Sequence, residues 1–241
     1  MKDTEEAMIL TRDDTFRVVF NLRTPTSPTQ FEVGTGVFVV RNGSEPFLVT
    51  ATHVARICTS ATQLVLSDNT GNATELRLSD FNGGLGWQHH PVADISVLRV
   101  IPDSVLAPKL EGRFLSYDQF HLDKTPVSRD FELTSVGFPN GLGAQGMFSP
   151  LTYRSDASSA FITMNRADTN TPCDFFMLEN PSMGGYSGCP VFDLGYMVVG
   201  AMTTTKEKTM CYGIMHGTVS DKTGGKLAAV TPSHYLRDLL G

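Results

Sequence analysis

Short runs of apolar residues, or of alternating apolar and polar residues, make up most of the 241-residue chain and are separated by Gly, Pro, Asn, Asp and Ser. Alternation with a period of two places the apolar side chains on one face of a strand, so these runs predict β-strands. Many short strands at this spacing indicate an all-β barrel or sandwich. We expect strands over residues 15–22, 31–40, 47–52, 62–67, 73–79, 94–100, 131–138, 160–165, 174–179, 190–193, 196–204, 211–215 and 226–231.

Signals for helices are few. The clearest lies at the end of the chain, where Ser233 could cap a short helix that carries Leu236, Leu239 and Leu240 on one side. Residues 101–113 contain two prolines and interrupt the strand pattern, which indicates a connection between an N-terminal and a C-terminal half.

The composition is that of a globular protein with a sizeable core. Hydrophobic residues make up 41% of the chain and charged residues 18%. The formal net charge is −6, and no run of Lys and Arg forms a basic stripe. We therefore expect neither nucleic acid nor an anionic membrane as a partner.

The chain also carries no signal that predicts a membrane or export. Residues 1–10 are acidic, and their apolar run is too short for the core of a signal peptide. Apolar runs such as residues 33–40 are much shorter than the roughly 20 residues that span a bilayer as a helix. We therefore expect a cytoplasmic protein.

The chain has four cysteines, an even number, but none of them has CxxC spacing. A chain of this length does not need disulfides to fold, and a reducing compartment would keep the thiols free. We expect free, mostly buried thiols and no structural zinc site. The cysteines are Cys58, Cys173, Cys189 and Cys211.

Two groups of histidines could suggest a metal. His89 and His90 are adjacent, and neighbouring side chains on a strand point to opposite faces, so we expect a solvated loop there. His216 and Cys211 could form a ligand pair, but no third or fourth ligand is evident. The sequence therefore predicts no metal and no cofactor.

The segment MGGYSGCPV predicts an exposed nucleophile at Ser187. Glycines two residues before and one residue after the serine allow a tight turn, because glycine adopts the required backbone angles at little cost. Such a turn leaves the amides of Gly185 and Ser187 free to hold an oxyanion, a large electrostatic contribution to acyl transfer. A tight-turn serine without catalytic function is the alternative.

A serine hydroxyl is a weak nucleophile and needs a base, which in turn needs an orienting group. His53 follows the apolar run FLVTAT, and Asp94 begins the apolar run DISVLRV. Taken singly, a core histidine and a strand-initiating aspartate would be ordinary. Together with the Ser187 turn, the two residues predict a nucleophilic hydrolase site.

These motifs resemble those of the chymotrypsin-like serine peptidases, especially the bacterial HtrA-like branch. Thr50-Ala51-Thr52-His53-Val54 is similar to the histidine motif of that family, and Asp94-Ile95-Ser96-Val97-Leu98 to the aspartate motif. Residues 185–191, GYSGCPV, approximate the serine motif, and the order His, Asp, Ser is that of the family. Tyr186 and Cys189 depart from the usual residues beside the serine.

The resemblance implies a single peptidase domain over residues 1–241. Its fold would be all-β, with two antiparallel β-barrels packed face to face and a short C-terminal helix. Residues of about 15–110 would form the barrel that carries His53 and Asp94. Those of about 111–231 would form the barrel that carries Ser187, and residues 232–240 the helix. No length remains for a PDZ domain.

The resemblance also implies a mechanism. Ser187 would attack the carbonyl, His53 would accept its proton, Asp94 would orient His53, and the amides of Gly185 and Ser187 would bind the oxyanion. An acyl-enzyme would form and hydrolyse. The tyrosine at position 186 implies that activation does not use a newly cut N-terminus.

The specificity pocket would include Pro181, Ser182 and Met183. Because none of these is acidic, we expect a small or medium apolar side chain before the scissile bond rather than Lys or Arg. Thr203 would be the small hydroxyl residue beside Asp94, and residues 203–205, Thr203, Thr204 and Thr205, would pair with the substrate backbone.

The sequence thus predicts a serine endopeptidase that cleaves a protein or peptide substrate, with low basal activity and regulation by an activating partner protein or a ligand. Two alternatives stay open. One is a catalytically silent module of the same fold that binds peptides or proteins. The other is an esterase-like acyl-transfer hydrolase.

Overall fold

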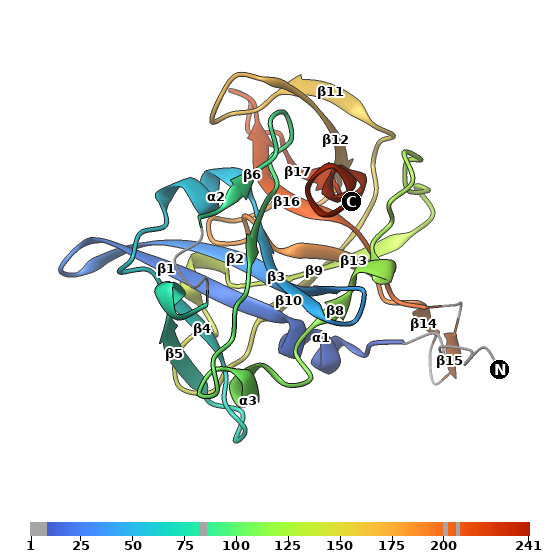
Figure 1. Cartoon of the computed structure of the whole chain (residues 1–241). Helices are drawn as coiled ribbons and strands as arrows, with labels where there is room; N and C mark the ends of the chain where they lie inside the picture. The colour runs from blue at the N-terminus through green and yellow to red at the C-terminus, as the bar shows by residue number, and fades with distance from the viewer. Residues whose placement is uncertain (1–8, 82–85, 200–201, 206–207) are drawn as a thin grey trace.

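Two antiparallel sheets follow one another along the chain in the computed structural model (Figure 1). The structure describes residues 9–81, 86–199, 202–205 and 208–241, so most of the acidic N-terminal segment considered above lies outside the described residues. The all-β fold with a short C-terminal helix, predicted from the sequence, is confirmed.

The first sheet carries the N-terminal half of the chain. Its strands run in the order β5-β4-β1-β2-β3-β7-β6, all antiparallel, and β8 pairs with β2 in parallel. Because β8 joins this sheet, the N-terminal unit extends past the expected boundary near residue 110. The strands are β1 (Val19–Ser27), β2 (Gln30–Arg41), β3 (Glu45–Thr50), β4 (Gln63–Ser67), β5 (Ala73–Arg77), β6 (Gln88–His89), β7 (Ser96–Arg99) and β8 (Leu115–Ser116).

The second sheet has the order β10-β9-β13-β16-β17-β12-β11 and is antiparallel throughout. The long segment 139–159, rich in Gly, Ser and Pro, contributes one of its strands. The strands are β9 (Glu132–Gly137), β10 (Leu151–Asp156), β11 (Ile162–Asn165), β12 (Pro172–Leu178), β13 (Pro190–Asp193), β16 (Met210–Ser220) and β17 (Lys226–Pro232).

Strict alternation along the first sheet divides its apolar side chains between two cores. In β2, Val37 joins the core shared with the second half, whereas its neighbour Phe38 packs inside the first half. Val49 and Leu48 of β3 divide in the same way. The shared core also contains Phe192 and Ile214 of the second sheet, so burial of apolar surface holds the halves together.

The helices are short. The first element among the described residues is α1 (Arg12–Val18), so the strand expected from residue 15 starts only at β1. Thr11 caps this helix and accepts a hydrogen bond from the amide of Asp14. The other helical elements are α2 (Thr52–Ile57), α3 (Ala107–Leu110), α4 (Arg237–Leu240) and the 3₁₀ turns Leu78–Asp80, Tyr117–Gln119, Pro139–Gly141 and Ser233–Leu236.

The helix predicted at the C-terminus is present as a 3₁₀ turn followed by α4. Ser233 does not cap it, because its hydroxyl donates to the His121 carbonyl O at 2.7 Å. No helix in the described part of the chain is long and apolar enough to cross a bilayer.

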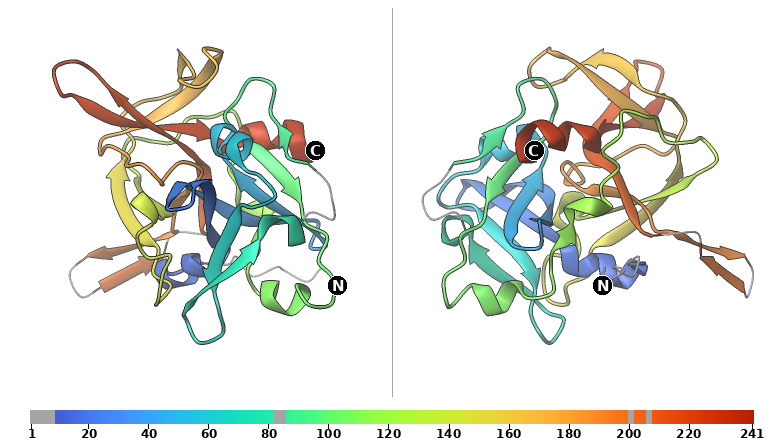
Figure 2. Two further views of the ribbon diagram at one scale, coloured as in Figure 1. Left: turned by 90° about the vertical axis from the view of Figure 1, so that its left-hand side faces the viewer. Right: turned by 45° about the vertical axis from the view of Figure 1, so that its right-hand side comes forward.

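A separate two-stranded hairpin interrupts the second sheet. Residues 196–204 do not form the single strand expected from their apolar run: β14 (Tyr196–Val199) pairs only with β15 (Met202–Thr205) among the described residues. Residues 200–201, between the strands, lie outside the described residues. Figures 1 and 2 show that the hairpin stands out from both sheets.

Candidate active site

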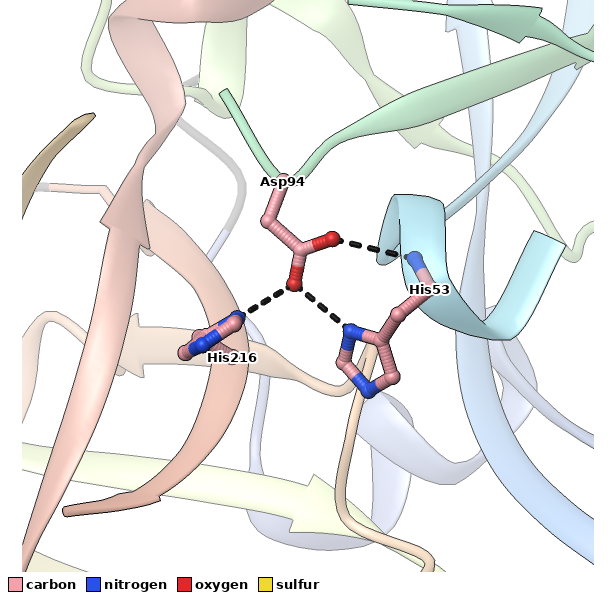
Figure 3. A group of neighbouring side chains, drawn as sticks. All are labelled: His53, Asp94 and His216. Carbon is pink, nitrogen blue, oxygen red and sulfur yellow. Dashed lines mark hydrogen bonds and ion pairs between the residues drawn. The ribbon is translucent and has the colours of Figure 1, made fainter. Parts of the chain in front are cut away.

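His53 and Asp94 meet because they lie at the paired ends of two strands. β3 ends at Thr50, which is opposite Ser96 at the start of β7. His53 lies in the first turn of α2, where backbone amides have no helical acceptor. Its amide donates to Asp94 Oδ1 at 3.0 Å, and its ring Nδ1 lies 2.7 Å from Asp94 Oδ2 (Figure 3). The carboxylate thus holds both the backbone and the ring of the histidine.

A second imidazole shares the same carboxylate oxygen. His216 Nδ1 lies 2.5 Å from Asp94 Oδ2, and the His53 and His216 rings pack edge to face with centroids 5.5 Å apart. His216 is the extra residue of a bulge in β16, between Met215 and Gly217 in the pairing with β17. A bulge redirects a side chain, and here it turns the ring of a strand residue toward Asp94.

Asp94 is fully buried, whereas the side chain of His53 is 29% exposed. Burial alone would raise the pKa of the Asp94 carboxyl, but the hydrogen bonds from His216 and His53 hold that pKa far below its usual range. The carboxylate is therefore charged at neutral pH and accepts hydrogen bonds from both rings. A neutral ring in either position then carries its proton on Nδ1, and in neutral His53 this makes Nε2 the proton acceptor.

Asp94 Oδ1 has a partner from the second half as well. Arg166 Nη2 lies 3.1 Å from it, and the Arg166 side chain is only 1% exposed. Neither His216 nor Arg166 was predicted to belong to the site. Both are far from Asp94 in sequence, and no local motif marks them.

The turn around Ser187 is fixed by hydrogen bonds to both halves. The amide of Thr35 in β2 donates to the Ser187 carbonyl O at 2.8 Å, and the Thr35 hydroxyl donates to the Gly185 carbonyl O at 2.7 Å. On the other side, the amide of Gly188 donates to the Met215 carbonyl O at 2.8 Å. The nucleophile segment is thus held between β2 and β16.

The peptide orientations in this turn follow from its carbonyl partners. The Gly184 carbonyl O accepts from the amide of Asn140 at 2.7 Å, and the Tyr186 carbonyl O accepts from the amide of Cys189 at 2.8 Å. In a trans peptide the N–H points opposite to the carbonyl, so the amides of Gly185 and Ser187 point away from these partners. Among the described residues, neither amide donates to a protein acceptor.

The hydroxyl of Ser187 donates to the His216 carbonyl O at 3.1 Å. Within the described residues it has no hydrogen bond to His53. The structure therefore joins His53 to Asp94 directly, and it joins Ser187 to them through His216, whose carbonyl faces the serine and whose ring faces the aspartate.

A hollow of about 280 Å³ opens beside these residues. It is lined by His53, residues 167–168 and residues 216–218. A larger hollow of about 440 Å³ lies between Pro46, Pro102 and the segment around α3, and it has no polar side chain from the candidate site. Of these two hollows, the smaller one lies beside His53 and His216.

Only some of the residues expected to contact a substrate lie at this site. Ser182 is joined to it, because the Thr218 hydroxyl donates to the Ser182 carbonyl O at 2.7 Å. Pro181 and Met183 flank Ser182. Thr203 does not lie beside Asp94: it pairs with Val198 in the projecting hairpin, and Thr203, Thr204 and Thr205 are exposed there. The cause is that β14 and β15 form a hairpin of their own, so β16 supplies the residue beside Asp94, which is His216.

Of the two adjacent histidines, both expected in a solvated loop, His89 is exposed and His90 is buried. His89 belongs to β6, and its Nδ1 lies 2.7 Å from Ser96 Oγ. His90 is 4% exposed: its Nδ1 accepts from the amides of Val92 and Ala93, and its Nε2 contacts Asp238 at 2.9 Å. His90 thus stabilises the turn that leads to Asp94.

The cysteines are free thiols, and three of the four are buried. Burial raises the pKa of the Cys189 thiol well above its ordinary value, although Cys189 follows Ser187 by only two residues. Cys189 is therefore a neutral core residue and has no thiolate to act as a nucleophile.

His53, Asp94 and His216 are also the kinds of residue that bind a metal. Ligands of one tetrahedral zinc ion, each at about 2.0–2.1 Å, lie about 3.3 Å apart. The two Nδ1 atoms lie 2.7 and 2.5 Å from Asp94 Oδ2, which are hydrogen-bond distances. As arranged here, the three side chains are therefore joined by hydrogen bonds.

A histidine after β3 and an aspartate before β7 of the first sheet, together with a serine turn before β13 of the second, are the arrangement of the trypsin-like class of hydrolase folds. The chain belongs to the family of trypsin-like peptidase domains, whose model matches residues 34–200. No curated protein matches the chain.

Solved structures show the same fold. The active form of the Rv3671c protease from M. tuberculosis aligns with a TM-score of 0.63 and 16% identity, covering 95% of this chain and 81% of that one. Its inactive form aligns with a TM-score of 0.58 and 16% identity, covering 95% and 89%. The serine endoprotease from Yersinia pestis aligns with a TM-score of 0.53 and 15% identity, covering 96% of this chain and 65% of that one.

Proposed function

We propose that this protein is a serine endopeptidase that cleaves protein or peptide substrates through His53, Asp94 and Ser187. The observation that carries the proposal is the contact of 2.7 Å between His53 Nδ1 and the buried carboxylate of Asp94, next to a serine in a fixed glycine turn. The family supports peptide bonds as the substrate.

The proposed steps use the groups described above. Ser187 Oγ attacks the carbonyl carbon, and its proton passes to His53 Nε2. The amides of Gly185 and Ser187 bind the oxyanion of the tetrahedral intermediate. The intermediate collapses to an acyl-enzyme as His53 gives the proton to the leaving amine, and water then releases the acid by the same path. Asp94 stabilises the imidazolium throughout.

The position of the Ser187 hydroxyl supports a resting state of low activity. Because it donates to the His216 carbonyl O, it must rotate to donate to His53 Nε2. An activating partner protein or ligand that favours the second rotamer would raise the activity. We therefore include regulation in the proposal.

The same hydrogen bond favours a second candidate, a catalytically silent module that binds peptides. Labelling with a fluorophosphonate probe, which reacts with an activated serine, separates the two. We expect labelling of the wild type, none of Ser187→Ala, and little of His53→Ala. Ser79→Ala, which removes an exposed serine elsewhere, should label like the wild type.

Labelling of wild type and Ser187→Ala alike, or of neither while both are folded, would contradict an activated Ser187. Peptide and ester substrates tested on the labelled protein then distinguish an endopeptidase from an esterase-like hydrolase. Ester turnover without any peptide cleavage would contradict the proposed peptidase activity.

A further inference from the structure

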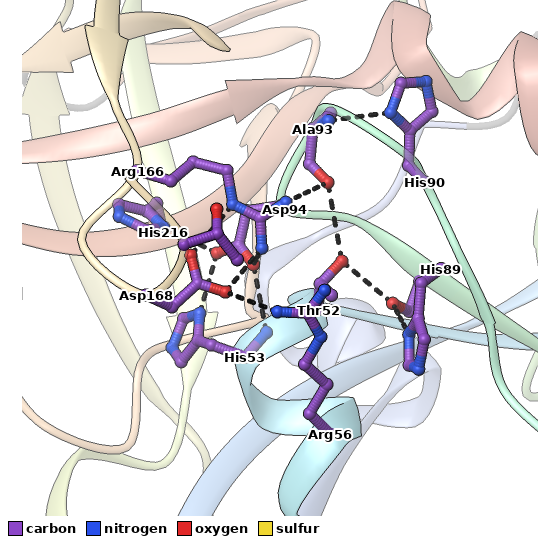
Figure 4. A network of polar contacts seen from close by, with 12 residues as sticks. Thr52, His53, Arg56, His89, His90, Ala93, Asp94, Arg166, Asp168 and His216 are labelled. Atoms are coloured by element: carbon purple, nitrogen blue, oxygen red, sulfur yellow. Dashed lines mark hydrogen bonds and ion pairs between the residues drawn. The ribbon is translucent and has the colours of Figure 1, made fainter. Parts of the chain in front are cut away.

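Arg166 lies in the turn between β11 and β12, and every donor group of its guanidinium is used (Figure 4). Nη1 donates to the carbonyl O atoms of Val92 at 3.0 Å and Ala93 at 2.9 Å. Nη2 donates to Asp94 Oδ1 at 3.1 Å and to Asp168 Oδ2 at 2.6 Å, and Nε donates to Asp168 Oδ1 at 2.9 Å. One buried arginine thus binds the Asp94 side chain and the backbone that carries it.

These contacts cross from one half of the molecule to the other. Asp94 precedes β7 of the first sheet, whereas Arg166 directly follows β11 of the second sheet. With both carbonyl groups and Oδ1 held, the Asp94 carboxylate cannot turn about its Cβ–Cγ bond without losing a charge-assisted hydrogen bond. Its Oδ2 therefore stays directed at His53 and His216.

Arg166 is itself held by Asp168. The two side chains form a bidentate pair, the arrangement in which a guanidinium is most firmly oriented. Arg56 of α2 reaches the same carboxylate at 3.5 Å. The turn is closed by the amide of Asn170, which donates to the Arg166 carbonyl O at 2.9 Å. Two carboxylates thus surround this buried guanidinium, so its charge is paired on both sides.

We propose that Arg166, held by Asp168, is a positioning residue that fixes the Asp94 carboxylate and so keeps the His53 ring in its Nδ1–H tautomer. This inference rests on the proposed function, because it gives Asp94 the role of orienting the catalytic base. It also makes the orientation of the base depend on how the two halves sit against each other.

The test compares Arg166→Gln, Arg166→Lys and Asp168→Asn with the wild type in two measurements. The first is the rate of fluorophosphonate labelling of Ser187. Since misplacing a reacting group by about 1 Å can cost about 100-fold, we expect a loss of about that size in Arg166→Gln and a smaller loss in Asp168→Asn. Arg166→Lys keeps the positive charge but loses the planar guanidinium that donates in several directions. Its labelling rate should therefore be closer to that of Arg166→Gln than to that of the wild type.

The second measurement is the nitrogen-15 NMR spectrum of the histidine side chains, which reports the tautomer without any turnover. We expect the Nδ1–H tautomer of His53 in the wild type and a mixture of tautomers in the variants. A residue that only stabilises the fold would leave this spectrum unchanged. Arg129→Gln, which removes an exposed arginine of the same half, is the matched control and should change neither measurement.

The outcomes separate the two proposals. If the wild type is not labelled, the proposed function fails, and the His53 spectrum still decides the role of Arg166. If the wild type is labelled and folded Arg166→Gln reacts at the same rate with an unchanged His53 spectrum, Arg166 is not a positioning residue. Should Arg166→Gln not fold, an unchanged spectrum in both Arg166→Lys and Asp168→Asn overturns the inference.

Discussion

His216 Nδ1 lies 2.5 Å from Asp94 Oδ2, the same oxygen that His53 Nδ1 contacts at 2.7 Å. The two imidazoles therefore bind the same oxygen of a fully buried carboxylate. Moreover, the backbone carbonyl of His216 accepts the hydroxyl of Ser187. His216 is thus the residue that links the three proposed catalytic groups, although it carries none of their functions itself.

Removal of the His216 ring should slow the reaction of Ser187. A hydrogen bond to a charged group contributes about 1.5–3 kcal/mol, which corresponds to about 10- to 100-fold in rate if it is all expressed in the transition state. We expect His216→Ala to lower kcat/KM within that range and His216→Ser, which restores a donor, to recover part of it. The rates of peptide cleavage or of fluorophosphonate labelling measure the effect.

His121→Ala is the control for the loss of a histidine, because His121 contacts Tyr212 and Thr125 rather than Asp94. Equal rates for folded His216→Ala and the wild type would show that the contact of the His216 ring with Asp94 has no effect on His53 as a base.

The lowered pKa of Asp94 predicts how stability depends on pH. Its folded-state pKa lies below the unfolded value of about 3.9, so its contribution is fully present above about pH 4 and is lost as the pH falls toward the folded value. In urea unfolding between pH 7 and pH 3, the free energy of unfolding of the wild type should therefore fall below about pH 4.

In Asp94→Asn, the free energy of unfolding should fall less between pH 7 and pH 3, because the contribution of the Asp94 carboxyl group is missing. Ser187→Ala keeps Asp94 and should follow the wild type, which separates loss of the carboxylate from loss of activity. An identical pH dependence for Asp94→Asn and the wild type would contradict a stabilised Asp94 carboxylate.

Much of the fold could be predicted because its signals are local. Alternation in residues 31–40 and 47–52 predicts β2 and β3, and their inward and outward side chains fill the two cores as the period of two requires. The positions of His53 at a strand end and of Asp94 before an apolar strand likewise follow from local patterns, and β3 and β7 pair at those ends.

The rest of the site could not be predicted, because it depends on contacts between distant segments. His216 is 122 residues from Asp94 and reaches it only through a bulge, which alternation of apolar residues does not reveal. Arg166 lies 72 residues from Asp94, in a connection that reads as polar and exposed. Its burial depends on Asp168 and on two carbonyl groups of the other half, none of which a local pattern identifies.

Substitution of Gly188 in the nucleophile turn should destabilise the protein by more than the strain of its positive φ alone. Gly188 has φ +87°, and an added Cβ would collide with the Thr35 carbonyl O and the Thr50 hydroxyl. Gly43 has φ +67° but no atom within 4 Å of an added Cβ, so Gly43→Ala isolates the backbone cost.

We expect Gly43→Ala to cost about 1 kcal/mol of stability, and Gly188→Ala to cost about 1–3 kcal/mol more because the core must shift. Thermal or urea unfolding measures both, and Gly188→Ala should also lose labelling of Ser187. Equal destabilisation by the two variants would mean that the turn accommodates an added Cβ at position 188 with no further loss of stability.

The hydrogen bond between Thr218 and Ser182 predicts the choice of substrate. The Thr218 hydroxyl donates to the Ser182 carbonyl O at 2.7 Å, so β16 is tied to the segment that we expect to form the specificity pocket. Thr218 also lines the hollow beside His53 and His216, and no acidic residue lies at 181–183 to pair with Lys or Arg. In a peptide library, the wild type should therefore prefer small or medium apolar residues before the scissile bond.

Thr218→Gly removes both the bulk and the hydrogen bond and should extend cleavage to larger apolar residues. Thr218→Ser keeps the hydroxyl and loses only a methyl group, so its preference should stay close to that of the wild type. Cleavage by the wild type after Lys or Arg would contradict the predicted pocket. An unchanged preference in Thr218→Gly would contradict a role for Thr218 in the choice of substrate.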